Sequence, residues 1–371
     1  MDNNNDIQYI IADSLKEATK GAGNINIIVA GKTGVGKSTL INSIFRGEFA
    51  RTGSGRPITK RIEEIKKPGH PLTIIDTKGL EVSDYEKIKD DLYNYIKERL
   101  LSDDQNEHIH IAWLCIAANG DRIENAEIDL CNMLNKNNIP VISVLTKSKK
   151  NDNFVKEAEK LLPNSKYIIP VRAIHEQLEE VDATLPPFGI DDLITSTSKL
   201  IPEAQNRAYA NALSNKNKGA LYVKKIQAEK EVNIASGLAI TAGATPIPFS
   251  DAIVLVPIQV GMIAKIGVTF GMELSTATLA TIIGSVLGSS TATIVGRTVV
   301  SGLLKLIPLA GPVIGGSIAG TTAGFLTKTL GNSYISVLYD FCFENPGKEI
   351  DIDIISASLK KKFNKLIGDK F

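Results

Sequence analysis

The sequence feature that most constrains the fold is a glycine-rich segment between an apolar run and a helical run. The segment Gly31-Lys-Thr-Gly-Val-Gly-Lys-Ser38 fits the pattern GxxxxGK[ST]. It follows residues 24–29, which are typical of a buried strand, and precedes residues 39–45, which have a helical pattern. This strand-loop-helix context predicts a loop that binds phosphate groups.

The residue types in this loop have a physical reason. Glycines allow successive backbone N–H groups to turn inward around phosphate oxygens, and a helix N-terminus adds the positive end of its dipole. Lys37 is predicted to contact the β- and γ-phosphates, and the Ser38 hydroxyl to bind magnesium. The predicted phosphate-binding residues are Gly31, Lys32, Thr33, Gly34, Val35, Gly36, Lys37, Ser38 and Thr39.

Two further segments support the same site. The apolar residues 72–75 precede Asp76-Thr-Lys-Gly79, in which Asp76 would hold the magnesium shell through water and the Gly79 N–H would meet a γ-phosphate. Residues 53–59 form a predicted flexible stretch that ends in Thr59, whose hydroxyl could cap magnesium when the γ-phosphate is bound. Such a stretch orders or collapses with hydrolysis, as a switch does.

The pattern from residue 24 to about 204 predicts an α/β fold. Short apolar runs alternate with helical stretches, which is the signature of a mostly parallel sheet with flanking helices. The predicted strands are residues 25–29, 72–75, 109–116, 141–145 and 167–171.

With these motifs in order, residues 24–204 resemble an Era-like P-loop GTPase of the translation-factor-related class. The resemblance implies GTP or GDP with Mg²⁺ as cofactors. It implies catalytic roles for Lys37, Thr59 and Gly79, and magnesium contacts from Ser38, Thr59 and Asp76.

The guanine-reading segment departs from that family. Where the family has Asn/Thr-Lys-x-Asp, the chain has Thr146-Lys-Ser-Lys149, so Thr146 and Lys147 match and the base-reading carboxylate is missing. Asp152 is an alternative source of that carboxylate, and Ala173 matches the position where a backbone N–H meets the base oxygen. Guanine preference therefore rests on the resemblance, and relaxed specificity stays open.

Hydrolysis is expected to be slow. Leu80 follows Gly79, at the position where signalling relatives place a glutamine that orients the attacking water. A second copy of the chain, a partner, or Arg51 and Arg56 in the predicted switch stretch are alternative sources of the missing group; solvated loop charge is the plainer interpretation of both arginines.

The second half of the chain is apolar, glycine-rich and nearly uncharged. Residues 232–250, 274–296 and 306–327 lack Asp, Glu, Lys and Arg, and each run approaches the length of about 20 residues that crosses a bilayer. Gly316, Gly320 and Gly324 are four residues apart, as are two further glycine pairs, Gly284 with Gly288 and Gly311 with Gly315. Such spacing suits helix pairing in lipid and equally suits a tightly packed bundle.

The segment Ala244-Thr-Pro-Ile-Pro-Phe-Ser-Asp251, with residues 258–263 after it and 307–311 later, resembles a hydrophobic domain of unknown function. That domain is joined to Era-like GTPase domains and often described as membrane-associated, and the resemblance spans residues 205–340. The tail has apolar residues at helical spacing and a basic face around residues 359–367, which fits a solvated closing helix or contact with anionic lipid. The predicted segments are an N-terminal helix (1–22), a GTPase domain (23–204), a helical connector (205–231), an all-α hydrophobic domain (232–332) and an amphipathic tail (333–371).

Charge and cysteine content limit the function. The 42 Lys and Arg residues balance 41 Asp and Glu residues, so no nucleic-acid partner is expected and an RNA-assembly GTPase is disfavoured. Scattered cysteines and the absence of a secretory start predict an intracellular, cytoplasm-facing location, membrane-associated or integral, otherwise cytosolic. The predicted function is a slowly hydrolysing GTP switch. Its predicted partners are membrane lipid and a second copy of the chain, bound through the nucleotide face. The alternatives are a nucleotide-holding interaction protein with little turnover and a soluble GTPase whose apolar domain is a packed bundle.

Overall fold

The computed structural model describes residues 3–20, 23–47, 49, 54–57, 62–77, 85–120, 122–149, 153–178, 183–243, 251–286 and 320–368. The chain divides into two compact units. Residues 23–223 form the nucleotide unit, and residues 1–22 together with 224–371 form the helical unit. The boundary falls within helix α9 (Lys218–Gly243).

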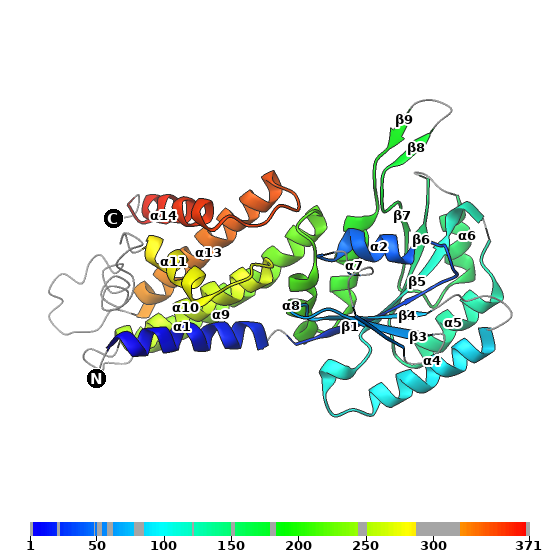
Figure 1. Cartoon of the computed structure of the whole chain (residues 1–371), viewed down its shortest axis with the longest axis horizontal. Helices are drawn as coiled ribbons and strands as arrows, with labels where there is room; N and C mark the ends of the chain where they lie inside the picture. The colour runs from blue at the N-terminus through cyan, green and yellow to red at the C-terminus, as the bar shows by residue number, and fades with distance from the viewer. Residues whose placement is uncertain are drawn as a thin grey trace. The chain divides into compact units, whose positions relative to one another are not determined.

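The nucleotide unit is built on a seven-stranded sheet with the order β2-β3-β4-β1-β5-β6-β7 in the part that is described (Figure 1). Strands β4, β1, β5, β6 and β7 run parallel, while β2 and β3 join one edge antiparallel. The strands are β1 (Ile25–Ala30), β2 (Ser54–Pro57), β3 (Ile62–Lys66), β4 (Leu72–Thr77), β5 (Ile111–Ala117), β6 (Val141–Thr146) and β7 (Tyr167–Val171). A separate hairpin pairs β8 (Glu176–Leu178) with β9 (Ala183–Leu185).

Helices cover both faces of this sheet. One core contains apolar side chains of α2, α7 and α8, and the other contains those of α4, α5 and α6. The helices are α2 (Lys37–Ile44), α4 (Tyr85–Leu100), α5 (Asn125–Lys136), α6 (Phe154–Leu161), α7 (Ile190–Leu200) and α8 (Glu203–Ala212), with the short 3-10 helices η1 (Gln105–Glu107) and η2 (Ala118–Gly120).

Strand β1 explains how the sequence produces two cores. Successive side chains of a strand point to opposite faces. Ile27 therefore packs into the α2 side and Ile28 into the α4 side, and every residue of β1 is buried. Trp113 of β5 is fully buried, stacks on Phe45 at 5.7 Å between ring centroids, and donates its indole N–H to Thr197 Oγ1 at 3.1 Å.

The predicted α/β class, with a mostly parallel sheet and flanking helices, is confirmed, and the five predicted runs correspond to β1, β4, β5, β6 and β7. Strands β2 and β3 were not predicted. Four residues of the stretch predicted to be flexible, Ser54–Pro57, form edge strand β2. Pro57 is tolerated there because an edge strand has N–H positions that need no ladder partner.

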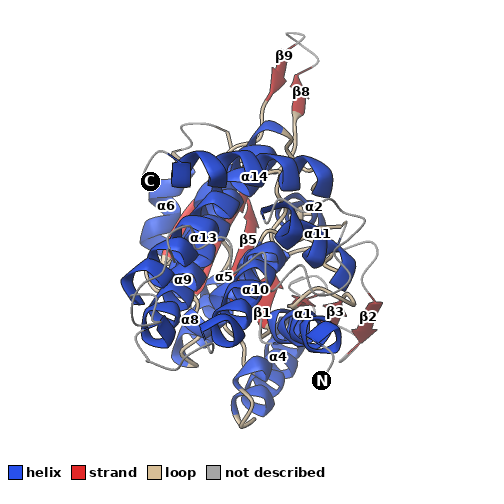
Figure 2. Cartoon of the chain, turned by 90° about the vertical axis from the view of Figure 1, so that its left-hand side faces the viewer, coloured by secondary structure: helices blue, strands red, loops and turns tan. Residues whose placement is uncertain are grey.

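The described residues of the helical unit are α-helical, apart from the connections (Figure 2). Helix α1 packs along α10, α11 packs on α14, and α13 contacts both α10 and α14. The helices are α1 (Asn3–Lys20), the later part of α9, α10 (Asp251–Thr269), α11 (Thr276–Val286), α13 (Gly320–Glu344) and α14 (Ile352–Gly368). Helix α14 contains the predicted closing helix of the tail.

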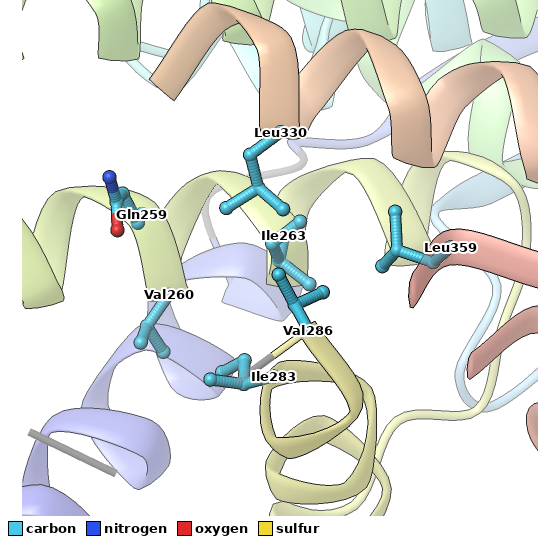
Figure 3. Close-up of a pocket in the computed structure, with 7 residues that line it drawn as sticks. All are labelled: Gln259, Val260, Ile263, Ile283, Val286, Leu330 and Leu359. Carbon is cyan, nitrogen blue, oxygen red and sulfur yellow. The ribbon is translucent and has the colours of Figure 1, made fainter. Parts of the chain in front are cut away.

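The interior of the helical unit is close-packed and apolar. Side chains from α10, α11, α13 and α14 converge on a small cavity of about 10 Å³, no larger than the space that a single water molecule needs (Figure 3). The lining residues are Gln259, Val260, Ile263, Ile283, Val286, Leu330 and Leu359. Gln259, the one polar residue among the described residues of this lining, donates its amide N–H to Thr327 Oγ1 at 3.1 Å.

Two glycines allow helices of this unit to approach closely. A Cβ added to Gly324 of α13 would lie 2.3 Å from Ile240 Cγ1 and 3.2 Å from the Ser236 carbonyl oxygen of α9. A Cβ at Gly331 would lie 2.5 Å from Val232 Cγ2. Of the predicted glycine spacings, Gly288, Gly311, Gly315 and Gly316 lie outside the described residues.

The charge-free runs do not mark the helix boundaries. Helix α9 continues from the charged connector into residues 232–243 without a break, and α11 begins at Thr276, two residues into the second run, whose residues 287–296 lie outside the described part of the chain. Most of the third run lies outside the described residues. Within the described ranges, no helix combines the length and the apolar content that crossing a membrane requires.

Candidate nucleotide-binding site

The candidate site begins at the loop between β1 and α2. Gly31 has a φ of 154°, and a Cβ added there would lie 2.4 Å from the Cys115 carbonyl oxygen of β5. No side chain fits at that distance, so the loop can leave the sheet here only because the residue is glycine. This close approach fixes the start of the loop against the neighbouring strand.

Gly34 and Gly36 shape the rest of the loop. Their φ angles are 76° and 103°, in the left-handed region that glycine adopts without strain. A Cβ added at either position would meet nothing within 4 Å among the described residues, so both backbone segments have room beside them. Gly36 is the N-cap of α2 and leaves the helix N-terminus without a side-chain cap. A phosphate group fits this arrangement, because an anion satisfies N–H groups at a helix N-terminus.

Lys37, the first residue of α2, brings its charge back to the loop. Its side chain is buried, and its ammonium group donates to Gly31 O at 2.8 Å and to Lys32 O at 3.2 Å. The Asp76 Oδ1 atom lies 3.9 Å from the same ammonium nitrogen. Asp76 is at the end of β4, where it pairs in register with Val29 of β1. The structure therefore brings Gly31, Lys32, Lys37 and Asp76 together, and their contacts with a nucleotide stay a prediction.

Ser38 and Thr39 follow in the first turn of α2 and are exposed, as is Thr33 in the loop. Ser38 is one residue from the buried Lys37 and remains accessible to a ligand. Thr59 and Gly79, the other predicted switch residues, lie outside the described residues, as do Arg51, Leu80 and Asp152. Arg56 belongs to β2, and its side chain is outside the description.

An acidic residue not predicted from the sequence holds one side of the loop. Glu124 Oε1 lies 2.5 Å from the Lys32 ammonium nitrogen and also pairs with Arg122. These hydrogen bonds, first that from Lys32, lower the pKa of the Glu124 carboxyl group. Glu124 is also the N-cap of α5 in a capping box with Glu127. The signal that could have identified Glu124 in the sequence is the Glu-x-x-Glu spacing just before a helical run, which is similar to the pattern of a capping box.

The loop after β6 is tied directly to the phosphate loop. Thr146 Oγ1 is buried, donates to Val35 O at 2.6 Å and lies 3.2 Å from Ile116 O. Lys147 has a φ of 55°, and its ammonium group donates to Gly34 O at 2.8 Å. Both residues were predicted to contact the nucleotide, and the structure places both against the loop that precedes α2.

The loops after β6 and β7 also meet. The Ser148 N–H donates to Val171 O at 3.2 Å, next to Arg172 and the partly exposed Ala173. Lys149 is exposed. The carboxyl ends of β1, β4, β6 and β7 thus bring the predicted phosphate-binding and base-reading segments to one edge of the parallel sheet, where ligands of such sheets bind.

Family models match two parts of the chain. A model described as "50S ribosome-binding GTPase" matches residues 26–147, and one described as "Domain of unknown function (DUF697)" matches residues 211–364. The first match contains the loop, Lys37, Asp76 and Thr146. The chain thus carries a P-loop GTPase domain, followed by a helical region that matches the second family.

Individual relatives match part of this chain over part of their own length. The human neuronal-specific septin-3 is 27% identical over 204 residues, which cover 47% of this chain and 57% of that protein. The tRNA modification GTPase MnmE of Marinomonas is 39% identical over 82 residues, 21% of this chain and 18% of that protein. The chain therefore spans somewhat more than half the length of the septin-3 relatives that it matches.

Solved structures also match at low similarity. The crystal structure of a probable GTP-binding protein engB has a TM-score of 0.32 and 24% identity, covering 40% of this chain and 89% of that chain. The structure of Toc33 from Arabidopsis thaliana in complex with Mg²⁺ and GMPPNP has a TM-score of 0.34 and 16% identity, covering 53% of this chain and 92% of that chain.

Proposed function

We propose that this chain is a GTP-binding and slowly hydrolysing molecular switch that holds GTP or GDP with Mg²⁺ on residues 31–39. The position of Lys37 carries the proposal: its buried ammonium group lies 2.8 Å from Gly31 O and 3.9 Å from the Asp76 carboxylate. An ammonium group beside an uncapped helix N-terminus suits a polyphosphate, because both favour negative charge. The family match of residues 26–147 supports a GTPase domain there.

The remaining proposed contacts with the nucleotide and Mg²⁺ come from residues at or near the same edge of the sheet. Asp76, Thr146, Lys147 and Ala173 are proposed to hold the rest of the nucleotide, and Ser38, Thr59 and Asp76 to hold Mg²⁺, Asp76 through water. The exposed Ser38 hydroxyl beside the buried Lys37 supports the metal proposal. Lys37, Thr59 and Gly79 are the proposed catalytic residues. The assignments of Thr59 and Gly79, and of the domain to the Era-like class, rest on the sequence motifs alone.

Nucleotide affinity tests this proposal directly. With Mg²⁺ present, the purified chain should bind GTP and GDP with micromolar or better affinity, and Lys37→Ala should weaken both by at least about 100-fold, because the β- and γ-phosphates lose their ammonium contact. Lys160→Ala, an exposed lysine of α6, is the matched control and should bind normally. Equal affinity of the wild type and Lys37→Ala would remove the proposal.

Slow turnover is proposed because Leu80 cannot orient a water molecule. We propose that a second copy, bound through the nucleotide face, supplies the missing group. Turnover per chain should then rise with protein concentration in the micromolar range. A rate that stays constant under these conditions would argue against the dimer, and an undetectable rate would favour a nucleotide-holding interaction protein.

We propose that the helical unit contacts a membrane surface from the cytoplasmic side. Ile234 and Leu238, four residues apart on α9, are 58% and 54% exposed, so adjacent turns of one helix present apolar side chains to solvent. Liposome flotation tests this contact: Ile234→Asp with Leu238→Asp should abolish flotation. Ile354→Asp on α14, where the isoleucine is 52% exposed, is the control, and equal flotation of all variants would contradict the proposal.

The segment boundaries predicted from the sequence are part of the proposal. The packing of α1 along α10 supports a role for residues 1–22 in stabilising the apolar region. Deleting these residues should therefore lower the melting temperature of the helical unit and leave GDP affinity unchanged. A truncated chain with an unchanged melting profile would contradict this role.

A further inference from the structure

The missing base-reading carboxylate is the unsolved part of the candidate site. Guanine presents N1–H and N2–H donors on its Watson–Crick edge, and a carboxylate accepts both. Lys149, at the position where the sequence pattern expects that carboxylate, can only donate. If the proposed function is correct, guanine selection needs an acceptor from another segment.

The loop that contains Lys149 lies next to the end of β7. The Ser148 N–H donates to Val171 O at 3.2 Å, and Val171 is followed by Arg172 and Ala173. Ser148 is buried, so this connection is part of the folded core and not a surface contact. The start of the segment after β7 is therefore tied to the segment that should read the base, and Glu176 lies five residues beyond Val171 in that segment.

Arg172 is a buried cation in that segment. Its side chain is 6% exposed, its guanidinium carbon lies 5.1 Å from the centre of the Phe188 ring, and its backbone exchanges two hydrogen bonds with Phe188 at 3.1 Å. These contacts fix both the backbone and the side chain of Arg172. Among the described residues, its Nε and Nη1 atoms have no hydrogen-bond partner.

The Glu176 carboxylate faces this cation. Its Oε2 atom lies 3.5 Å from Arg172 Nε, and its side chain is 50% exposed. A buried guanidinium group requires a nearby anion, which explains why the carboxylate is held on that side. The exposed half of Glu176 stays accessible, so the same carboxylate has lone pairs left for a ligand.

We propose that Glu176 is the specificity-determining carboxylate that accepts the guanine N1–H and N2–H groups in place of a residue at position 149, and that Arg172 positions it. This inference rests on the proposed GTP binding and adds the residue that selects the base. Glu176 begins β8, so the reading group would come from the segment after β7 and not from the loop after β6.

A swap of GDP for XDP tests the role of Glu176. Xanthine has an oxygen where guanine has its N2 amino group, so Glu176→Gln replaces an acceptor by an amide donor of the same size that suits xanthine. The XDP-to-GDP affinity ratio should rise by about 100-fold, with GDP weakened by at least about 10-fold. A purely structural role of Glu176 would change the affinity for both nucleotides by the same factor and leave the ratio unchanged.

Matched variants separate the alternatives. Glu98→Gln on α4, an exposed glutamate, and Lys149→Ala should both leave the ratio within about twofold of the wild type, since neither supplies the acceptor. Arg172→Met should weaken GDP by about threefold to tenfold, because Glu176 loses its orientation, and Arg172→Lys should restore part of that loss.

The outcomes distinguish this inference from the proposed function. A wild type that prefers GDP over ADP and XDP, together with a Glu176→Gln variant whose ratio is unchanged, overturns the inference and leaves GTP binding intact. Lys149→Ala changing the ratio while Glu176→Gln does not would overturn it in the same way. A wild type that binds no purine nucleotide overturns both.

Discussion

The two units use polar groups in opposite ways. In the nucleotide unit, side chains at the start of α2 and at the end of β6 bond to loop carbonyls: Lys37 to Gly31 O, Thr146 to Val35 O and Lys147 to Gly34 O. In the helical unit, a cavity of about 10 Å³ is lined by apolar side chains, with Gln259 as the one polar residue among the described lining residues. A parallel sheet ends in loops whose backbone groups are available to a ligand, whereas a helix satisfies its backbone internally. Chemistry is therefore expected in the first unit and association in the second.

Glycine illustrates the same contrast. Gly31, Gly34 and Gly36 have positive φ angles, so glycine is there for backbone conformation. Gly324 and Gly331 are within helix α13, where the absence of a Cβ allows the α9 and α10 side chains to approach. Substitution should therefore impair ligand binding in one unit and packing in the other.

Among the substitutions that separate the two units, Gly31→Ala should have the largest effect. A Cβ at this position would lie 2.4 Å from Cys115 O, so the loop must move away from β5. We expect GDP affinity to fall by about 100-fold, the loss typical of a displaced binding group. A titration with a fluorescent GDP analogue measures this, and the melting of the helical unit should not change. An affinity within threefold of the wild type would contradict the account of the loop.

Thr146→Val should destabilise the nucleotide unit by about 1–3 kcal/mol, because Val35 O and Ile116 O lose a buried donor. Urea unfolding monitored by Trp113 fluorescence reports on this unit, since that tryptophan is in its core. Thr195→Val is the control, because the Thr195 hydroxyl bonds to Asp191 O at an exposed site of α7. An equal decrease in the free energy of unfolding in the two variants would show that the buried hydrogen bond contributes no more to stability than the exposed one.

Gly324→Val should destabilise only the helical unit, by about 1–3 kcal/mol, because the added side chain overlaps Ile240 and approaches Ser236 O. Gly237→Ala in α9 is the matched opposite: nothing lies within 4 Å of its added Cβ, so a gain of up to about 1 kcal/mol is expected. Calorimetry should detect both changes in the unfolding transition of the helical unit, which is the transition whose melting temperature GDP does not change. A Gly324→Val chain with unchanged melting would refute the close helix approach.

The smallest expected effect concerns pH. His110 Nδ1 accepts the Asn26 N–H at 2.9 Å and its Nε2 donates to Gln105 O at 3.0 Å, so the neutral ring is the bonded form. Burial lowers the pKa of His110 below its value of about 6.5 in an unfolded chain. The unfolded state then binds more protons, so this contribution to stability is present above about pH 6.5 and is lost as pH falls below it, by at most about 1.4 kcal/mol per pH unit.

Urea midpoints between pH 7.5 and 5.5 test this sign. His110→Gln should flatten the decline of stability at acid pH, and His175→Gln, at an exposed position, should leave the wild-type profile unchanged. A wild-type nucleotide unit that gains stability on acidification through this range would be incompatible with a neutral buried His110.

The sequence predicted the parts of the fold that local patterns determine. The phosphate loop and the five parallel strands are readable because glycine spacing and apolar runs are local signals. Strand β3 was missed because Ile62-Glu-Glu-Ile-Lys66 has only two apolar residues, and β2 because it contains glycine and proline; both are strands through pairing with their neighbours.

The parts of the site that depend on tertiary contacts were not predictable. The pairing of Lys32 with Glu124 and of Arg172 with Glu176 depends on which loops meet at the sheet edge. The change of composition at residue 232 likewise does not indicate where a helix ends, because α9 runs through this position. The roles of Thr59 and Gly79 stay predictions.

Hydrogen–deuterium exchange of the full chain, with and without GDP and Mg²⁺, tests the central claim that the nucleotide unit holds the ligand at the start of α2. Backbone amides of residues 31–39 and 146–148 should become protected when GDP is added, while those of α10 and α13 keep their exchange rates. Protection that appears only in the helical unit, or none at residues 31–39 under saturating GDP, would contradict the account.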